Sequence, residues 1–288
     1  PRPDQGPSRR GSQSEATEQT PLQREQGPDN GPSRRSTLRE KGVEPTGRSV
    51  SPGTRRLSLN NLSPVQVRHD FVRKVYGILL MQLLVTALLG CAIMAVLKNH
   101  MHLLLPVTFT SIGVYFCISL SFCCCPKMLR CFPMNYIILG IITGALGCLA
   151  GVICTQYTGK SVLIVLGITM LVVLTLTIFA CQTTCDFTGA GPFLACACAV
   201  LIGFGLLISV VHLFGVSGET FNVLHIVYSA GAALIFSVHI VYDTQLIVGG
   251  NHRYEYGLDD YCFAALSLYV DIMEVFLHLL ALFGTRQQ

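Results

Sequence analysis

Seven long apolar runs follow one another along the chain after residue 74, separated by short polar or turn-forming links. They cover residues 75–97, 103–123, 135–156, 161–181, 192–214, 223–248 and 261–283. Each run, at roughly 20 residues, is long enough to cross a bilayer as a helix. The links are too short to hold a substantial soluble domain. The pattern therefore predicts an all-α polytopic membrane protein, built as a bundle of seven transmembrane helices.

Charged residues are distributed unevenly, which divides the chain into two parts. The chain is 51% hydrophobic and 12% charged, and 22 of its 36 Lys, Arg, Asp and Glu residues fall within residues 1–74. Residues 1–64 also hold nine of the 13 prolines and very few large apolar side chains. Such a segment cannot bury enough surface to offset chain ordering. We therefore predict a disordered tail, 1–64, and a transmembrane domain, 65–288.

Basic residues near the ends of the runs predict the orientation of the domain. A cytoplasmic N-terminus places six of them on the cytoplasmic side and three on the other: Arg68, Arg73, Lys74, Lys127, Arg130 and Arg253 against Lys98, Lys160 and Arg286. The tail is therefore expected to be cytoplasmic. Seven full crossings would leave the C-terminus outside or in the lumen, whereas a last segment that re-enters would return it to the cytoplasm.

Two groups of residues at the predicted cytoplasmic face are candidates for modification. Serines that closely follow paired arginines suit phosphorylation, which would neutralise a basic, membrane-attracted tail; the alternative is simply solvated charge. Cysteines at the membrane edge suit reversible palmitoylation, and their spacing shows no zinc signature with histidines. The serines are Ser12, Ser36 and Ser58, and the cysteines are Cys123, Cys124, Cys125 and Cys131.

Two acids interrupt the last two apolar runs. Asp271 lies near the middle of residues 261–283, and Asp243 lies near the end of residues 223–248. An ionisable side chain at such depth is costly, so it usually faces a protein interior or a water path. Both acids are fourteen residues from Gly257 in the polar link. An antiparallel hairpin turning there would place the two carboxylates at a similar depth, where they could share a site.

Further ionisable residues share the helical faces of these acids. Asp271, Glu274 and His278 are spaced i, i+3 and i+7, and His239 is four residues before Asp243. One interpretation is a buried network that holds the bundle together. The other is a proton-sensitive ion path in which Asp243 and Asp271 share a proton and form a weak calcium site. Glu274, His239 and His278 would then modify that path.

Glycines form a stripe in the third predicted helix. Gly140, Gly144, Gly147 and Gly151 are spaced by four, three and four residues, which places them on one helical face. Small residues at this spacing let a neighbouring backbone approach closely. The stripe therefore predicts a packing surface rather than a chemical site.

Short motifs occur in order along the predicted membrane domain. They read FVRKVY at 71–76, QLLVT at 82–86, FPMNY at 132–136, GIT at 167–169, QTTCDFT at 182–188, YDTQL at 242–246 and LYVDI at 268–272. Together they resemble the lifeguard branch of the transmembrane Bax inhibitor motif family, from about residue 70 to residue 284. Several motifs in the right order make the resemblance highly specific. It implies a seven-helix membrane protein with the last helix near the centre.

The same resemblance implies a function. It is that of a pH-sensitive calcium leak channel of intracellular membranes, with Asp243 and Asp271 as the pH-sensing pair and calcium as the transported ion. It also implies inhibition of apoptosis, including death-receptor signalling, in Golgi or endoplasmic reticulum membranes. The expected partners are the lipid bilayer, calcium ions and death-receptor or Bcl family regulators, and neither a cofactor nor a nucleic acid is expected.

Two rival functions use the same residues differently. A non-conducting membrane scaffold would inhibit death-receptor signalling through protein contacts, and its acids would only stabilise the bundle. An intramembrane aspartyl protease would also need two acids, which Tyr242-Asp243 and Asp271 superficially supply. However, Leu268-Tyr269-Val270 precedes Asp271 without the glycines that would open the backbone for a substrate. We therefore expect the protein not to be an enzyme.

Overall fold

The computed structural model describes residues 64–124, 132–215, 218–250 and 252–287. Within these residues the chain forms seven long α-helices, each long and apolar enough to cross a membrane, so the predicted all-α membrane fold is confirmed. They are α1 (Pro64–Asn99), α2 (Leu104–Cys124), α3 (Met134–Cys154), α4 (Gly159–Gln182), α5 (Gly191–Leu213), α6 (Glu219–Val248) and α7 (Tyr261–Phe283). Short 3-10 helices precede α2, α5 and α7: Met101–Leu103, Thr188–Ala190 and Leu258–Asp260. The predicted disordered tail lies outside the described residues, apart from Pro64.

The first helix begins eleven residues earlier than its apolar run predicts, and it is 36 residues long. Phe71, Val75 and Leu79 recur every four residues, so they share one helical face, and all three are buried. The charged residues between them lie on the other faces and do not end the helix. A continuous apolar run predicts only the part of α1 that lies in hydrocarbon. It therefore does not predict the amphipathic start of the helix, which carries Arg68.

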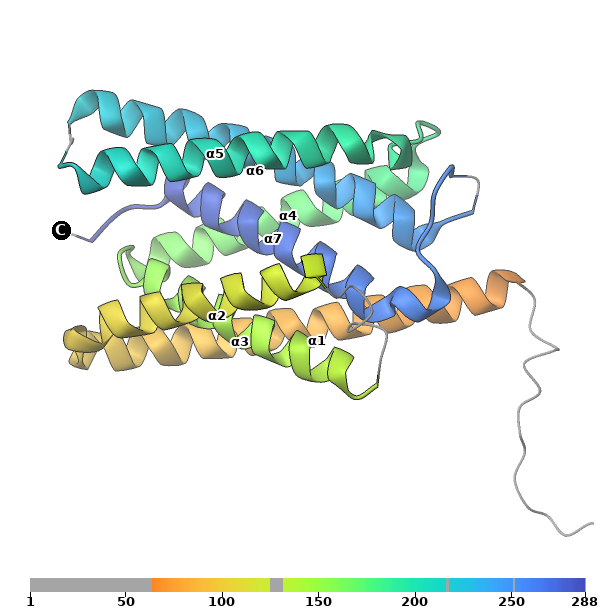
Figure 1. Ribbon diagram of the computed structural model, residues 1–288, viewed down its shortest axis with the longest axis horizontal. Helices are drawn as coiled ribbons and strands as arrows, with labels where there is room; N and C mark the ends of the chain where they lie inside the picture. The colour runs from red at the N-terminus through yellow and green to blue at the C-terminus, as the bar shows by residue number, and fades with distance from the viewer. Residues whose placement is uncertain (1–63, 125–131, 216–217, 251, 288) are drawn as a thin grey trace, which may run out of the picture. The chain divides into compact units, whose positions relative to one another are not determined.

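The seventh helix lies inside the bundle. α7 contacts α1, α3, α4 and α6, and α3 and α7 are the most buried of the seven spans. In Figure 1, α7 runs between α5 and α6 on one side and α1, α2 and α3 on the other. Its position agrees with the central last helix that the resemblance implies. An acid on α7 is therefore enclosed by protein rather than by lipid.

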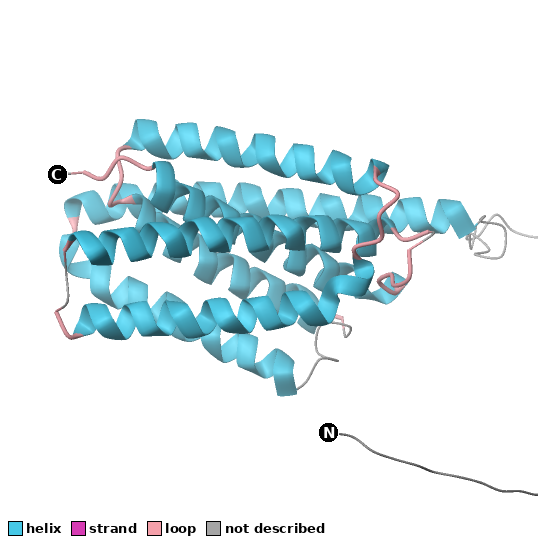
Figure 2. Ribbon diagram, turned by 90° about the horizontal axis from the view of Figure 1, so that it is seen from above, coloured by secondary structure: helices cyan, strands magenta, loops and turns pink. Residues whose placement is uncertain are grey.

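The two ends of the bundle are held by different links (Figure 2). The start of α1 and the link between α6 and α7 lie at one end, and the described C-terminal residues lie at the other (Figure 1). There, the Thr158 amide donates to the Thr285 carbonyl and the Gln287 amide to the Gln156 carbonyl, both over 2.9 Å. α7 has 23 residues, so it is about 35 Å long. The last helix therefore runs from one end of the bundle to the other (Figure 1).

Two of the four glycines in the stripe on α3 pack closely against α1, as predicted. A Cβ on Gly151 would lie 2.8 Å from Ile93 Cβ, and a Cβ on Gly147 would lie 3.3 Å from the side chain of Leu89, so α1 approaches α3 closely at both positions. Gly140 and Gly144 have open space instead, with no neighbouring atom within 4 Å of an added Cβ. The packing prediction is wrong for these two because the helices diverge toward the start of α3.

Candidate functional site

The two predicted acids meet in the interior. Asp243 comes from α6 and Asp271 from α7, and their side chains are only 2% and 6% exposed. The two carboxyl groups lie close enough to interact directly, and Ser267, one turn before Asp271, lies beside Asp243. The Oδ2 atom of each acid has no partner among the other described groups. Because two ionised carboxylates repel each other at close range, one proton shared between the two groups would stabilise this arrangement.

A tyrosine from the link between α6 and α7 completes the surroundings of the pair. The hydroxyl of Tyr256 donates to Oδ1 of Asp243 over 3.2 Å. Burial, and then the neighbouring Asp243, raise the pKa of the Tyr256 phenol above its usual value, which keeps the hydroxyl protonated as a donor. The tyrosine is held in place because its amide donates to the Leu246 carbonyl over 3.0 Å. The conformation of this link therefore decides whether Asp243 keeps its hydrogen bond from the Tyr256 hydroxyl.

Arg68 from the extension of α1 clamps the same link. Its guanidinium donates to three carbonyls: Nη2 to Leu246 over 2.6 Å, Nη1 to Tyr256 over 2.7 Å, and Nε to Val248 over 3.1 Å. Leu246 and Val248 are in the last turn of α6, where carbonyls lack intrahelical partners and the helix dipole favours a cation. A carboxylate oxygen of Glu255 lies 3.8 Å away. Arg68 precedes the first apolar run, so the pattern of the sequence indicates its charge but not its contact with the α6–α7 link.

The QTTCDFT motif holds the link from the opposite side. Asp186 accepts hydrogen bonds from the amide and hydroxyl of Thr188, and from the amide of Arg253 over 2.8 Å. These bonds, that from the Thr188 hydroxyl first, lower the pKa of the Asp186 carboxyl below its usual value. The buried amide of Gln245 donates to the Cys185 carbonyl and accepts from the amide of Phe187. Two of the motifs that carry the resemblance thus join the α4–α5 and α6–α7 links.

A cavity of about 260 Å³ reaches Asp271, one acid of the pair. Five helices contribute to its walls, and its polar lining groups include Asp271 and Ser267 of α7, Tyr115 and Ser119 of α2, and Cys198 of α5. His239 of α6 also lines it, with its Nε2 atom 3.2 Å from Cys198 Sγ. A hydrated cation approaching Asp271 through this cavity would meet hydroxyl, thiol and imidazole groups rather than hydrocarbon alone.

The remaining predicted residues lie around this centre in different ways. His239 faces α5 and bonds to the Leu194 backbone as well as lying beside Cys198, so it does not join Asp243 as its spacing suggested. Glu274 and His278 form their own pair on α7, 3.6 Å apart, and the His278 ring stacks on Phe236. Glu274 also acts electrostatically on Asp271, so it lies between that acid and His278 along α7.

Some predictions concern residues whose surroundings the structure does not define. Ser12, Ser36 and Ser58, together with Cys125 and Cys131, lie outside the described residues, while Cys123 and Cys124 end α2. Phosphorylation and palmitoylation remain predictions. Within the described ranges, no group of three His, Cys, Asp or Glu residues is placed to hold a metal ion. A cation at Asp243 and Asp271 would need hydroxyls, carbonyls or water to complete its shell.

Seven apolar helices, the last of them central and carrying one acid of a buried carboxyl pair, define a polytopic membrane protein with an intramembrane acid site. Residues 68–288 match the family described as Inhibitor of apoptosis-promoting Bax1. The chain belongs to that family of membrane proteins, which is linked to inhibition of apoptosis.

Similar proteins come from animals and plants. Protein lifeguard 3 of Mus musculus is 35% identical over 227 residues, covering 77% of this chain and 71% of the relative. Protein lifeguard 3 of Homo sapiens is also 35% identical over 227 residues, covering 77% and 70%. Protein LIFEGUARD 4 of Arabidopsis thaliana is 34% identical over 260 residues, covering 86% and 97%. These matches extend over most of each chain.

Proposed function

We propose that the protein is a pH-sensitive calcium leak channel of intracellular membranes, Golgi or endoplasmic reticulum, that restrains apoptosis. The observation that carries the proposal is the close approach of Asp243 and Asp271 beside a cavity whose lining includes Asp271 and several polar side chains. Two carboxyls in contact cannot both ionise without repulsion, so the pair gains or loses a proton as one unit. A cation competes with that proton for the same oxygens. Proton loss would therefore favour calcium occupancy and a looser bundle.

Two carboxylates suit transport better than storage. Calcium usually takes six to eight oxygen ligands, and high-affinity sites supply several carboxylates. Here two acids, the Ser267 hydroxyl and the Tyr256 hydroxyl offer an incomplete shell. Weak binding lets an ion leave as readily as it enters, which conduction requires. Glu274 lies one turn beyond Asp271 and would act as a secondary cation ligand in the path.

Calcium flux from proteoliposomes tests the proposal. We expect a leak that changes between about pH 6 and about pH 8, and that loses its pH dependence in Asp243→Asn and Asp271→Asn. Glu274→Gln should shift the size of the leak and leave its pH dependence in place. Asp259→Asn is the matched control, because Asp259 is an exposed acid outside the pair. Well-folded protein without calcium flux at any pH would reject the channel.

The rival function is a non-conducting scaffold that binds death-receptor or Bcl family regulators. It predicts that Asp243→Asn and Asp271→Asn leave protection from apoptosis unchanged whenever the protein folds. The channel function predicts that protection from apoptosis changes together with the calcium flux in the same variants. Measuring both in cells that express each variant at equal levels therefore separates the two.

A further inference from the structure

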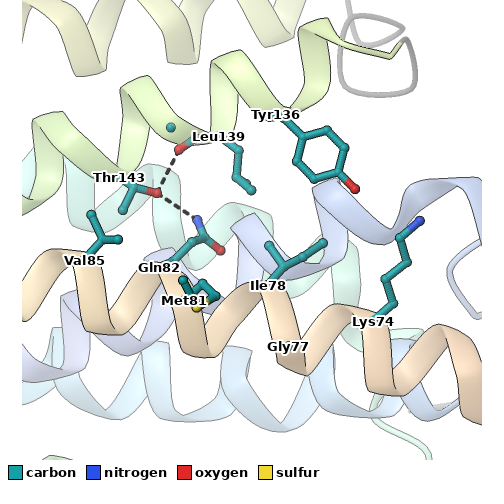
Figure 3. Close-up of a pocket in the computed structure, with 10 residues that line it drawn as sticks. Lys74, Gly77, Ile78, Met81, Gln82, Val85, Tyr136, Leu139 and Thr143 are labelled. Carbon is teal, nitrogen blue, oxygen red and sulfur yellow. Dashed lines mark hydrogen bonds between the residues drawn. The ribbon is translucent and has the colours of Figure 1, made fainter.

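A groove of about 470 Å³ lies between α1 and α3, away from the acid pair. Figure 3 shows Lys74 and Tyr136 at one end of this α1–α3 groove, and Gln82 with Thr143 at the other. Met81 is 59% exposed and Tyr136 is 40% exposed. The groove thus opens to the outside of the bundle, where the membrane lies. A ligand in it would come from the bilayer.

Two glycines keep the groove open. Gly77 on α1 and Gly140 on α3 both line it, and an added Cβ at either position would meet no other atom within 4 Å. Elsewhere along the same two helices, Gly147 and Gly151 bring the backbones close together. α1 and α3 therefore pack tightly along one half and leave a space along the other. An empty apolar space in a bilayer is filled by hydrocarbon.

The length of the groove matches one leaflet. Residues 75–97 contain no Asp, Glu, Lys or Arg, so Lys74 is the last charge before the hydrocarbon-spanning part of α1. From Lys74 to Val85, the last groove residue of α1, the helix rises about 16 Å at about 1.5 Å per residue. Half of a hydrocarbon core of about 30 Å is about 15 Å. The groove therefore runs from the interface to the bilayer midplane, as an acyl chain does.

Aromatic residues place the Lys74 end at the level of the lipid headgroups. The Lys74 ammonium lies over the Tyr261 ring, 3.2 Å from its centroid, and the Tyr136 ring is 6.3 Å from the same ring. Asn135 donates to the Tyr261 hydroxyl over 3.2 Å, which holds that ring in position. Tyrosine pairs of this kind are typical of the membrane interface. Lys74 is thus held where a phosphate would lie, and attraction to anionic lipid is strongest there.

Toward the inner end of the groove, two polar side chains from α1 and α3 bond to each other. The amide nitrogen of Gln82 donates to Thr143 Oγ1 over 3.1 Å, and that hydroxyl donates to the Leu139 carbonyl over 2.7 Å. A second transmembrane helix would need a continuous path across the bilayer. Since the groove ends near Val85 of α1 and Thr143 of α3, it fits a single chain of one leaflet better than a helix.

We propose that the α1–α3 groove binds one anionic glycerophospholipid, with its phosphate on Lys74 and one acyl chain along Gly77 and Gly140. A choline lipid carries its own cation beside the phosphate, so it gains less from the Lys74 ammonium. The bound lipid fills the space between the starts of α1 and α3, and it stabilises the helix that carries Arg68. The site does not depend on calcium transport, because none of its residues belongs to the acid pair.

Native mass spectrometry of the delipidated full chain tests the site. The protein is titrated with phosphatidylglycerol and, separately, with phosphatidylcholine of identical acyl chains. We expect one phosphatidylglycerol molecule to bind tightly and phosphatidylcholine to bind more weakly. Lys74→Gln should weaken phosphatidylglycerol binding about fivefold by removing one lysine at the interface. Gly140→Leu should weaken both lipids at least about tenfold, because it displaces several chain methylenes.

Gly113→Leu is the matched control for the filling variant. Gly113 is an exposed glycine on α2 with open space around it, so a leucine there adds the same bulk outside the groove. Thermal melting confirms that each variant is folded. The proposal would be overturned if both lipids bound equally, or if Lys74→Gln left phosphatidylglycerol binding unchanged. It would also be overturned if Gly113→Leu and Gly140→Leu weakened lipid binding equally. A loss of self-association in Gly140→Leu with lipid binding intact would overturn it too, since the groove would then hold a helix from a second copy.

Discussion

Replacing Arg68 with alanine should release the link between α6 and α7 from the end of α6. The guanidinium connects α1 to the Leu246, Val248 and Tyr256 carbonyls. Without it, the link keeps the Asp186 contacts on its other side and the hydrogen bond from the Tyr256 amide to Leu246. We therefore expect a local opening rather than global unfolding.

The size of the effect follows from the three hydrogen bonds. Each bond from a charged donor contributes about 1.5–3 kcal/mol net, so three bonds set an upper bound of roughly 4.5–9 kcal/mol. The Arg68 side chain is 15% exposed, so water reaches the freed carbonyls and replaces part of that energy. We expect a loss of about 2–4 kcal/mol after this discount. The open population should rise by a factor of roughly 30 to 900.

Hydrogen exchange at the Tyr256 amide measures this opening, with the protein in lipid nanodiscs. Arg68→Ala should speed exchange there by the same factor, and Arg68→Lys should give an intermediate rate, because one ammonium cannot reach three carbonyls in the geometry of a guanidinium fork. Arg73→Ala is the matched control, since Arg73 is an exposed arginine one turn further along α1. An unchanged rate in Arg68→Ala, or an equal rise in Arg73→Ala, would refute the clamp.

Two further predictions concern packing and the second contact of the link. Gly151→Ala places a Cβ against Ile93 and should cost about 1–3 kcal/mol by overpacking, whereas Gly144→Ala, with open space, should leave the melting temperature in detergent nearly unchanged. The Asp186 carboxyl has a pKa below its usual 3.8, so its contribution is complete above that pH and is lost as pH falls through the lower folded value. Asp186→Asn should speed exchange of the Arg253 amide at neutral pH; no change there would contradict the contact.

The acid pair shows how far counting along the chain can go. Equal separation from Gly257 placed both acids at one depth, and the structure does bring the two carboxyls together. The hairpin is nevertheless uneven: α6 ends five residues after Asp243, and α7 begins ten residues before Asp271. The irregular link absorbs the difference. Its course depends on Arg68 and Asp186, which come from other parts of the chain.

Histidine spacing was a weaker guide. His239 and Asp243 are four residues apart, yet the imidazole lies beside Cys198 on α5. Spacing of this kind limits which residues share a helical face, but a face is wide enough to meet two neighbouring helices. Which neighbour a side chain meets depends on how the helices cross. That information is spread over the packing of the whole bundle.

The sequence by itself determined the class of fold and the residues that carry its chemistry. The thickness of the hydrocarbon fixes the length of each span, and the cost of charge in that medium makes Asp243 and Asp271 stand out. Only the tertiary structure decided that Arg68 clamps the link, that Asp186 holds its other side, and that α1 and α3 leave a groove beside Lys74. These features join residues distant along the chain through hydrogen bonds and close packing, which no local pattern of polarity records.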